Sequence, residues 1–382
     1  MGVGRLLDTL RTMDNGEPMA IYRWPVLVLA TALVTLGGIC GTTIPIHAAD
    51  APRPTLRIHN WEDYLAPQVV AEFERRFNAK IEVVTFSDEE EALEHLSRAG
   101  APFDLMVLSG SAVRRAREAS LLGEIDPLKI PNLKNVDKAF RMPFYDTQAK
   151  SHVPYLWGTT GIVVNRTRIK EPGKGWEVLW DQGLKGKIAM LNSPEEVVGA
   201  ALKSMGYSMN SVETAQLERA RERLLAQKPL LAGYLESTEI RDRLVSGKLW
   251  AAQIYSGDAM AAIEKNTELA YIIPTQGAAR WVDNLVIPAN ARNRDLALAF
   301  MNFILEPEIG ALNASEMGSA SPNAAAVPFM DKELLANPAV YPPDEIAARL
   351  ETLSERGASA ERDARRNFVG DVWAQLTAKK KR

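Results

Sequence analysis

From residue 55 onward, the chain alternates between short apolar runs typical of strands and longer runs with helical periodicity. This spacing predicts strands at 55–61, 80–86 and 103–109, and helices at 66–78, 88–100 and 111–122. Strands that alternate with helices in this way build right-handed βαβ units. We therefore expect this part of the chain to form a mostly parallel sheet flanked by helices.

A second set of the same kind follows a proline-rich connection at 126–143. The pattern predicts strands at 152–165, 187–191, 249–257, 270–276 and 281–288, and helices at 193–206, 212–227 and 295–307. Two α/β lobes, with the chain crossing between them more than once, are the simplest account. Such sheets bind ligands beyond the carboxyl ends of their strands, so a ligand cleft is expected between the lobes.

The crossing points give provisional boundaries for the two lobes. Lobe 1 is expected to comprise residues 50–155 and 284–320. Lobe 2 is expected to comprise residues 156–283 and 321–382, including the C-terminal helices. Each lobe would then carry its own sheet and its own hydrophobic core.

The N-terminal part of the chain has the features of an export signal. An apolar run at 24–39 follows Arg23 and leads to small residues, so residues 1–49 are predicted to be a signal peptide cleaved after Ala48 or Ala49. The residues before Met19 are charge-balanced, which makes Met19 an alternative start. An uncleaved membrane anchor is the other interpretation, because the run is slightly shorter than a full span. Either way, the bulk of the protein is expected in the periplasm.

Charge and cysteine content exclude several classes of function. The chain has 45 basic and 48 acidic residues, a net charge of −3, so no basic field favours nucleic acid. The single cysteine, Cys40, lies inside the predicted signal, where lipidation is conceivable although Ile39 is a poor neighbour for it. The exported part then has neither disulfides nor thiol chemistry. We expect a monomer stabilised by its core alone.

Motifs of the common enzyme classes are missing from the sequence. It contains no G-x-G-x-x-G after a strand, no phosphate-binding G-x-x-x-x-G-K-[ST], no G-x-S-x-G and no H-E-x-x-H. The four histidines are scattered at positions 47, 59, 95 and 152. We therefore expect no catalytic residue, no metal site and no cofactor.

An aromatic residue recurs close to a carboxylate at the ends of predicted strands. The pairs are Trp61 with Asp63, Tyr255 with Asp258, and Trp281 with Asp283. Carboxylates pair with ammonium groups, and aromatic faces attract cations and cover methylene chains. Three such pairs favour a site for an organic cation.

Each of these acids also has a structural interpretation. Glu62 and Asp63 could simply lead into a helix, and Asp258 could cap the helix that follows it. Glu196 follows Ser193 by three residues, which is also the spacing of a capping box. Asp283 is harder to explain structurally, because a carboxylate within an apolar strand needs a partner.

Several segments resemble the periplasmic polyamine-binding proteins of ABC transporters, over about residues 56–350. The segments are NWEDY at 60–64, FDLMVLS at 103–109, VPYLWGTTGI at 153–162, SPEEV at 193–197, WVDNLVIPANA at 281–291 and NPAVYPP at 337–343. The resemblance implies a two-lobed periplasmic binding protein that closes on an extended polyamine and delivers it to the transporter's permease. Contact with the membrane would occur only through the signal segment or the permease.

The resemblance also implies which side chains contact the ligand. The positions that match are Trp61, Asp63, Ser109, Ser111, Glu196, Tyr255, Asp258, Trp281 and Asp283, with Glu62, Tyr64, Trp157 and Ser193 as weaker candidates. The aromatic residues would form walls, the acids would face the ammonium groups, and Ser109 and Ser111 would add hydroxyl contacts. Tyr64 and Trp157 could also serve only in packing.

Departures from the family pattern bear on which polyamine binds. Ser193 stands where similar spermidine binders carry an acid, and Ser319 stands where they carry a tyrosine. Asp63 and the Gly257-Asp258 pair resemble the putrescine-type branch, while Glu62 adds an acid that leaves the preference open. Putrescine is thus favoured, with spermidine as a second ligand. An anchored polyamine sensor and a glycoside-cleaving enzyme that uses paired acids are the alternative functions.

Overall fold

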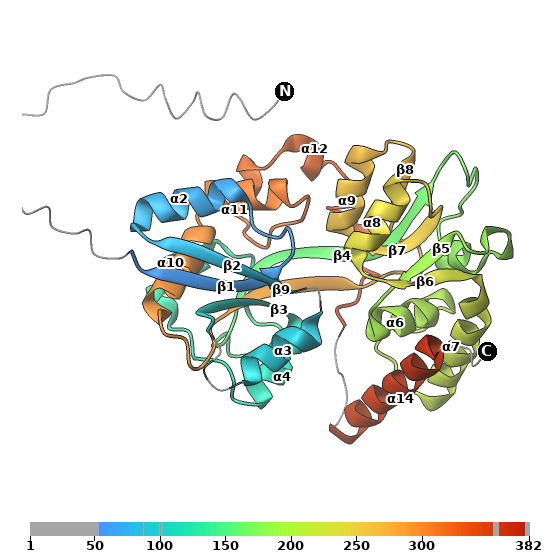
Figure 1. Cartoon of the computed structure of the whole chain (residues 1–382), viewed down its shortest axis with the longest axis horizontal. Coiled ribbons are helices and arrows are strands. Elements are labelled where there is room, and N and C mark those ends of the chain that lie inside the picture. The colour runs from blue at the N-terminus through green and yellow to red at the C-terminus, as the bar shows by residue number, and fades with distance from the viewer. Residues whose placement is uncertain (1–52, 87, 99, 101, 354–358, 379–382) are drawn as a thin grey trace, which may run out of the picture. The chain divides into compact units, whose positions relative to one another are not determined.

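The computed structural model describes residues 53–86, 88–98, 100, 102–353 and 359–378. The predicted signal peptide, Met19 and Cys40 lie outside the described residues. Nine strands form one sheet in the order β2-β1-β3-β9-β4-β7-β5-β6, and β8 pairs with β4 (Figure 1). The strands are β1 (Thr55–Trp61), β2 (Lys80–Phe86), β3 (Leu105–Ser109), β4 (Val153–Asn165), β5 (Ile188–Leu191), β6 (Leu231–Leu235), β7 (Ala251–Tyr255), β8 (Leu269–Ile272) and β9 (Arg280–Val286).

Helices precede, connect or follow these strands along the chain. They are α2 (Pro67–Phe77), α3 (Glu89–Ser97), α4 (Gly110–Glu118), α5 (Lys138–Arg141), α6 (Pro194–Ser204), α7 (Thr214–Gln227), α8 (Ser237–Val245), α9 (Ser256–Lys265), α10 (Arg294–Ile304), α11 (Pro307–Glu316), α12 (Lys332–Leu335), α13 (Asp344–Ala347) and α14 (Ser359–Thr377). Within the described part of the chain, none of them is long and apolar enough to cross a bilayer.

The first βαβ unit shows how the sequence pattern produces the fold. Leu56 and Ile58 alternate inward along β1, while Val69 and Phe73 lie four residues apart on the buried face of α2. The helix ends at Asn78, whose φ of 46° is a left-handed conformation that asparagine tolerates. β2 then pairs in parallel with β1 along its whole length, as the alternation predicted.

The sheet is mixed, which refines the expectation of mostly parallel sheets. Parallel pairs join β1 to β2 and β3, and join β5 to β6 and β7. The strands β4 and β9 add antiparallel pairs, because each returns beside a strand that runs the other way. Residues 153–159 of β4 pair with β9, and residues 160–165 pair with β7 and β8. A single long strand therefore carries the chain from one group of parallel strands to the other.

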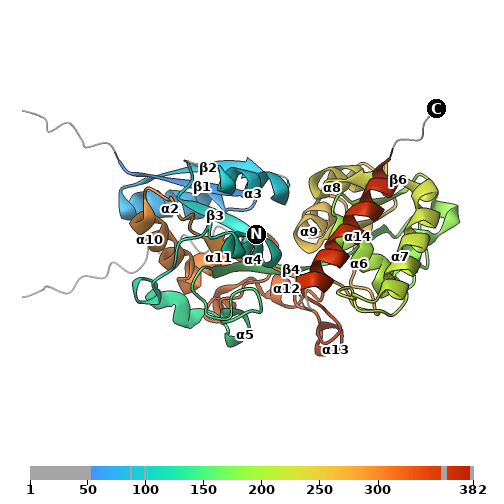
Figure 2. The ribbon, with the colours of Figure 1, turned by 90° about the horizontal axis from the view of Figure 1, so that it is seen from below.

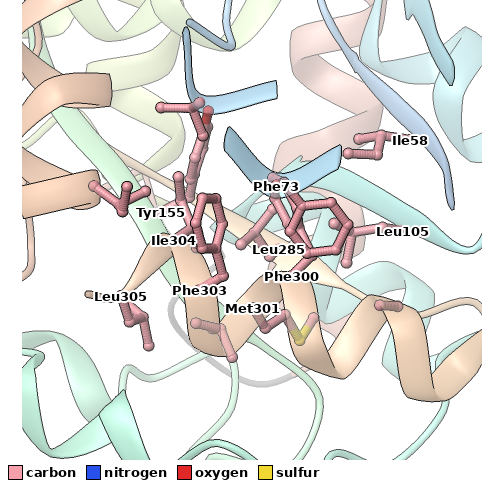
Figure 3. Close-up of a cluster of buried hydrophobic side chains, with 14 of the residues drawn as sticks. Ile58, Phe73, Leu105, Tyr155, Leu285, Phe300, Met301, Phe303, Ile304 and Leu305 are labelled. Carbon is pink, nitrogen blue, oxygen red and sulfur yellow. The ribbon is translucent and has the colours of Figure 1, made fainter. Parts of the chain in front are cut away.

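Separate hydrophobic cores lie on the two sides of this crossing. One core packs α2, α10 and α11 on the first group of strands, with Phe73 in edge-to-face contact with Phe300 and Phe303 (Figure 3). Another surrounds the buried Trp176, where α14 packs against α6 and α7 (Figure 2). Truncating a buried aromatic in either core is expected to cost about 3–5 kcal/mol of stability. The lobe boundaries themselves stay a prediction.

Some predicted elements end earlier than their patterns suggested, and some were missed. The helix expected at 111–122 ends at Glu118, followed by Ser120 with a φ of 57°. The strand β6 and the helix α8 were not predicted at all. Both are short, and α8 buries only Ile240 and Leu244, so its periodic signal is weak.

Candidate functional site

Strand register brings the predicted aromatic and acidic residues together around the middle of β4. Trp281 on β9 lies opposite Gly158, and Tyr255 at the end of β7 lies opposite Thr160. Asp283, two residues after Trp281, lies opposite Ser109 at the end of β3. The sheet itself therefore gathers side chains from positions up to about 170 residues apart in sequence.

Trp281 and Tyr255 form one aromatic corner of this site. Their ring centroids are 6.2 Å apart at an interplanar angle of 86°. This geometry requires Gly158, because a Cβ there would lie 2.3 Å from the Trp281 ring. Trp61, the last residue of β1, packs on Phe86 with ring centroids 4.4 Å apart. Trp61, Tyr255 and Trp281 are all half-buried.

Asp283 is a buried carboxylate in the middle of the sheet. Its Oδ2 accepts a hydrogen bond of 2.9 Å from the Tyr64 hydroxyl. Burial raises the pKa of Asp283 to about 7; the Tyr64 hydrogen bond opposes this rise, and the negative charge of Glu89 adds to it. The Tyr64 carbonyl in turn accepts from the Tyr155 hydroxyl at 2.7 Å. Tyr64, a weaker candidate from sequence, thus holds and orients the Asp283 side chain.

Glu196 is the second buried carboxylate, and it enters from the first turn of α6. Its Oε1 accepts a hydrogen bond of 2.9 Å from the Thr160 hydroxyl on β4. Burial raises the pKa of Glu196 to about 7, against the lowering effect of the Thr160 hydrogen bond. The Ser193 side chain makes no capping hydrogen bond to α6. The capping-box interpretation is therefore wrong, and Glu196 points to the sheet.

Ser193 contributes to the same site through Tyr255. Burial raises the pKa of the Tyr255 hydroxyl well above its usual value, and the charge of Glu196 raises it further. A hydrogen-bonding contact with the Ser193 side chain acts in the opposite direction. Ser193 therefore lies beside the aromatic corner.

Glu89 belongs to this site, although sequence reasoning missed it. It is the first residue of α3, and its carboxylate accepts from the Ser109 amide and the Ser109 hydroxyl, each at 2.9 Å. The Ser109 and Ser111 hydroxyls are 2.9 Å apart. Burial raises the pKa of Glu89, and its charge raises those of Asp283 and Tyr255. In the sequence Glu89 sits inside a run of four acids, which looks like an ordinary solvated helix start.

Asp63 and Asp258 are placed together, but with a cation of the chain between them. Arg241 Nη1 lies 3.1 Å from Asp258 Oδ1 and 3.9 Å from Asp63 Oδ2. Burial raises the pKa of Asp258, and Arg241 opposes the rise. Asp258 lies in the first turn of α9 and makes no capping hydrogen bond there, so its side chain serves the ion pair instead.

The remaining weaker candidates lie at the margin of the site. Glu62 is exposed. Trp157 donates its indole N–H to the Ser321 carbonyl at 3.3 Å and packs between Phe140 and Tyr341, which is a structural role. The buried indole nitrogens of Trp61 and Trp281 have no hydrogen-bond partner within the described residues. No group of three or more potential metal ligands occurs among those residues either.

Comparison with known proteins identifies the family. The family model described as bacterial extracellular solute-binding protein matches residues 68–342. The chain belongs to this family. The putrescine-binding periplasmic protein PotF of Escherichia coli is 32% identical over 333 residues, covering 82% of this chain and 90% of that protein. The putrescine/cadaverine-binding protein of Pseudomonas aeruginosa is 29% identical over 335 residues, covering 84% and 93%.

Solved structures of the family agree with the fold of this chain. A putative spermidine/putrescine ABC transporter protein from Listeria monocytogenes superposes with a TM-score of 0.78 at 33% identity, covering 84% of this chain and 98% of that one. The match confirms the two-lobed periplasmic binding protein fold, and the relatives confirm the resemblance to polyamine-binding proteins. As a member of this family, the chain is a solute-binding protein.

Proposed function

We propose that this solute-binding protein captures polyamines outside the cytoplasm and delivers them to the permease of an ABC importer. Putrescine is the favoured ligand and spermidine a second one. The two relatives named above as putrescine binders support the ligand class, and the name of the Escherichia coli relative, a periplasmic protein, supports the location. The protein would act as a monomer, exported by its N-terminal signal and meeting the membrane at the permease.

The buried carboxylates Asp283 and Glu196 carry this proposal. Both are at most 9% exposed, and neither forms an ion pair with any described residue. Burying an uncompensated carboxylate costs several kcal/mol, which a ligand cation would recover. A neutral ligand such as a sugar would leave this cost in place. Two separate acids beside aromatic rings fit a molecule with a cation at each end and methylenes between.

The structure supports a division of roles among the site residues. Asp283 and Glu89 would pair with one ammonium group, and Glu196 with the other. Trp61, Tyr255 and Trp281 would cover the methylene chain and attract the cationic ends. The hydroxyls of Ser109, Ser111 and Ser193 would accept the remaining N–H donors. Lobe closure would exclude water and so strengthen each of these ion pairs.

The outer acids and the weaker candidates complete the assignment. Asp63 and Asp258 would form an outer pair of carboxylates with Arg241 between them. Tyr64 would orient Asp283, and Trp157 would pack next to the aromatic residues that contact the ligand. Glu62 would stay in solvent near the entrance. No observation on the described residues favours the glycosidase or sensor alternatives over capture.

Isothermal titration calorimetry with matched ligands tests the proposal. Putrescine, cadaverine, agmatine, spermidine and spermine would be compared with n-butylamine, which has the chain length of putrescine but only one cation. Loss of one buried ion pair of about 3 kcal/mol or more predicts at least 100-fold weaker binding of n-butylamine. Equal binding of putrescine and n-butylamine, or no polyamine binding at millimolar ligand, would overturn the proposal.

A further inference from the structure

Arg241 places a cation of the chain itself beside two acids assigned to the ligand. Its side chain is 16% exposed, and its Nη1 donates to Asp258 Oδ1 at 3.1 Å. The same nitrogen lies 3.9 Å from Asp63 Oδ2, and Nε donates to Asp242 at 3.3 Å. Asp63 follows β1, whose side chains pack in one hydrophobic core, whereas α8 packs in another. The guanidinium therefore links acids carried by separately packed elements.

The acids of the site consequently fall into two groups. Asp283, Glu196 and Glu89 form no ion pair with any residue in the described ranges. Asp63 and Asp258 already have a positive charge between them. The first group can receive ammonium groups from a ligand without displacing a cationic side chain of the protein. The second group can do so only in competition with Arg241.

We infer that Arg241 determines specificity: its guanidinium occupies the place of a third ammonium group, so the site accepts diamines and disfavours triamines. The inference rests on the proposed polyamine capture and names the residue that determines how many ammonium groups the site accepts. An arginine stays protonated at every physiological pH, so it cannot give up its charge to make room for another cation. An additional ammonium near Asp258 would meet this charge in a partly desolvated setting.

The ion pair between Arg241 and Asp258 is less exposed than an ordinary surface ion pair, which fits a role in specificity. Asp258 is 20% exposed at its side chain, so its pairing with Arg241 is only partly screened by water. Asp63 is 76% exposed, which makes its contact with Arg241 the weaker of the two. Removal of the guanidinium should therefore release Asp258 in particular as a counter-charge for a longer ligand.

The test compares Arg241→Gln with Arg243→Gln on the same helix. Arg243 follows Arg241 by two residues and pairs with Glu239, one turn earlier on the helix, in an exposed ion pair. The Arg243 variant therefore controls for the removal of a positive charge from α8. Calorimetric titration at fixed salt would measure the dissociation constants of putrescine and spermidine. We expect Arg241→Gln to tighten spermidine at least tenfold while putrescine stays within threefold, and Arg243→Gln to change neither. Arg241→Lys, which keeps the charge, should retain the wild-type preference.

A double variant shows whether Asp258 receives the extra ammonium. Adding Asp258→Asn to Arg241→Gln should remove the gain in spermidine affinity. An unchanged ratio of the two dissociation constants in Arg241→Gln, or an equal change for both ligands, would overturn the inference while leaving polyamine capture intact. Failure of wild type to bind either ligand is a different result, because it refutes the proposed function itself.

Discussion

Replacing Asp283 by asparagine separates two effects of its buried carboxylate: the loss of folding stability that it causes and the ligand affinity that it provides. Raising the pKa of Asp283 from 3.8 to about 7 means that the ionised side chain is roughly 4 kcal/mol less favourable in the fold than in the unfolded chain. The folded chain holds this proton more tightly, so the unfolding free energy without ligand should fall as pH rises from about 4 to about 8. Asparagine keeps the shape of the side chain and removes the contribution of Asp283 to this pH dependence, while that of Glu196 remains.

The expected magnitudes follow from the contacts of the side chain. At pH 8, Asp283→Asn should be more stable than wild type by about 3 kcal/mol, because removing the buried charge gains roughly 4 kcal/mol and the altered Tyr64 hydrogen bond costs about 1 kcal/mol. At pH 5 the two proteins should differ by less than about 1 kcal/mol, since the aspartate is then protonated. Putrescine should bind the variant at least 100-fold more weakly.

The assay is urea unfolding of the ligand-free protein at several pH values, together with calorimetric titration of putrescine. Asp104→Asn is the matched control, because Asp104 is also a buried acid but lies just before the opposite end of β3. Its carboxylate accepts from the amides of Arg57, Arg292 and Asn293 at 2.7–3.1 Å. Asp104→Asn should lose about 2 kcal/mol or more and bind putrescine normally. A less stable Asp283→Asn with normal affinity would refute the assignment.

Other expected outcomes test the aromatic walls of the site, the release of protons on ligand binding, and the preference between putrescine and spermidine. Trp281→Ala should weaken putrescine binding by about 2 kcal/mol or more with little change in melting temperature, whereas the core variant Trp176→Ala should do the reverse. Because the pKa values of Asp283 and Glu196 lie at about 7, putrescine binding at pH 7 should release protons, and the affinity should fall toward pH 5.5. Calorimetric titrations in buffers of different ionisation enthalpy would detect the released protons. Equal binding heats in all buffers would contradict the prediction. Ser193→Asp should narrow or reverse the preference for putrescine over spermidine; tighter spermidine binding by wild type, unchanged in the variant, would show that Ser193 does not set it.

The sequence predicted those parts of the site that depend on regular strands. Trp61, Tyr255 and Trp281 lie at or next to strand ends, Asp283 lies in the middle of β9, and the alternating pattern located these strands to within a few residues. Sheet register then determines which of these side chains meet. The antiparallel pairing of β9 with β4 follows from the path of the chain, so the local pattern could not reveal it.

Glu89 and Arg241 were missed for a different reason. Both are charged residues near other charges, and such runs usually form solvated faces. Glu89 acquires its role only because Ser109, twenty residues later, ends a strand beside it. Arg241 acquires its role because α8 and α9 pack together and bring it to Asp258. These placements depend on tertiary packing, which periodicity alone does not report.

The positions of the acids explain how the fold tolerates a site rich in negative charge. Glu89, Glu196 and Asp258 all lie in the first turns of helices, at α3, α6 and α9. The helix dipole favours a carboxylate there by about 0.3–1 kcal/mol, which offsets part of the burial cost. Asp283 lies on a strand and has no such support. Of the buried acids, Asp283 should therefore depend most on the ligand's positive charge, and the affinity lost on its removal should exceed that lost on removal of Glu196.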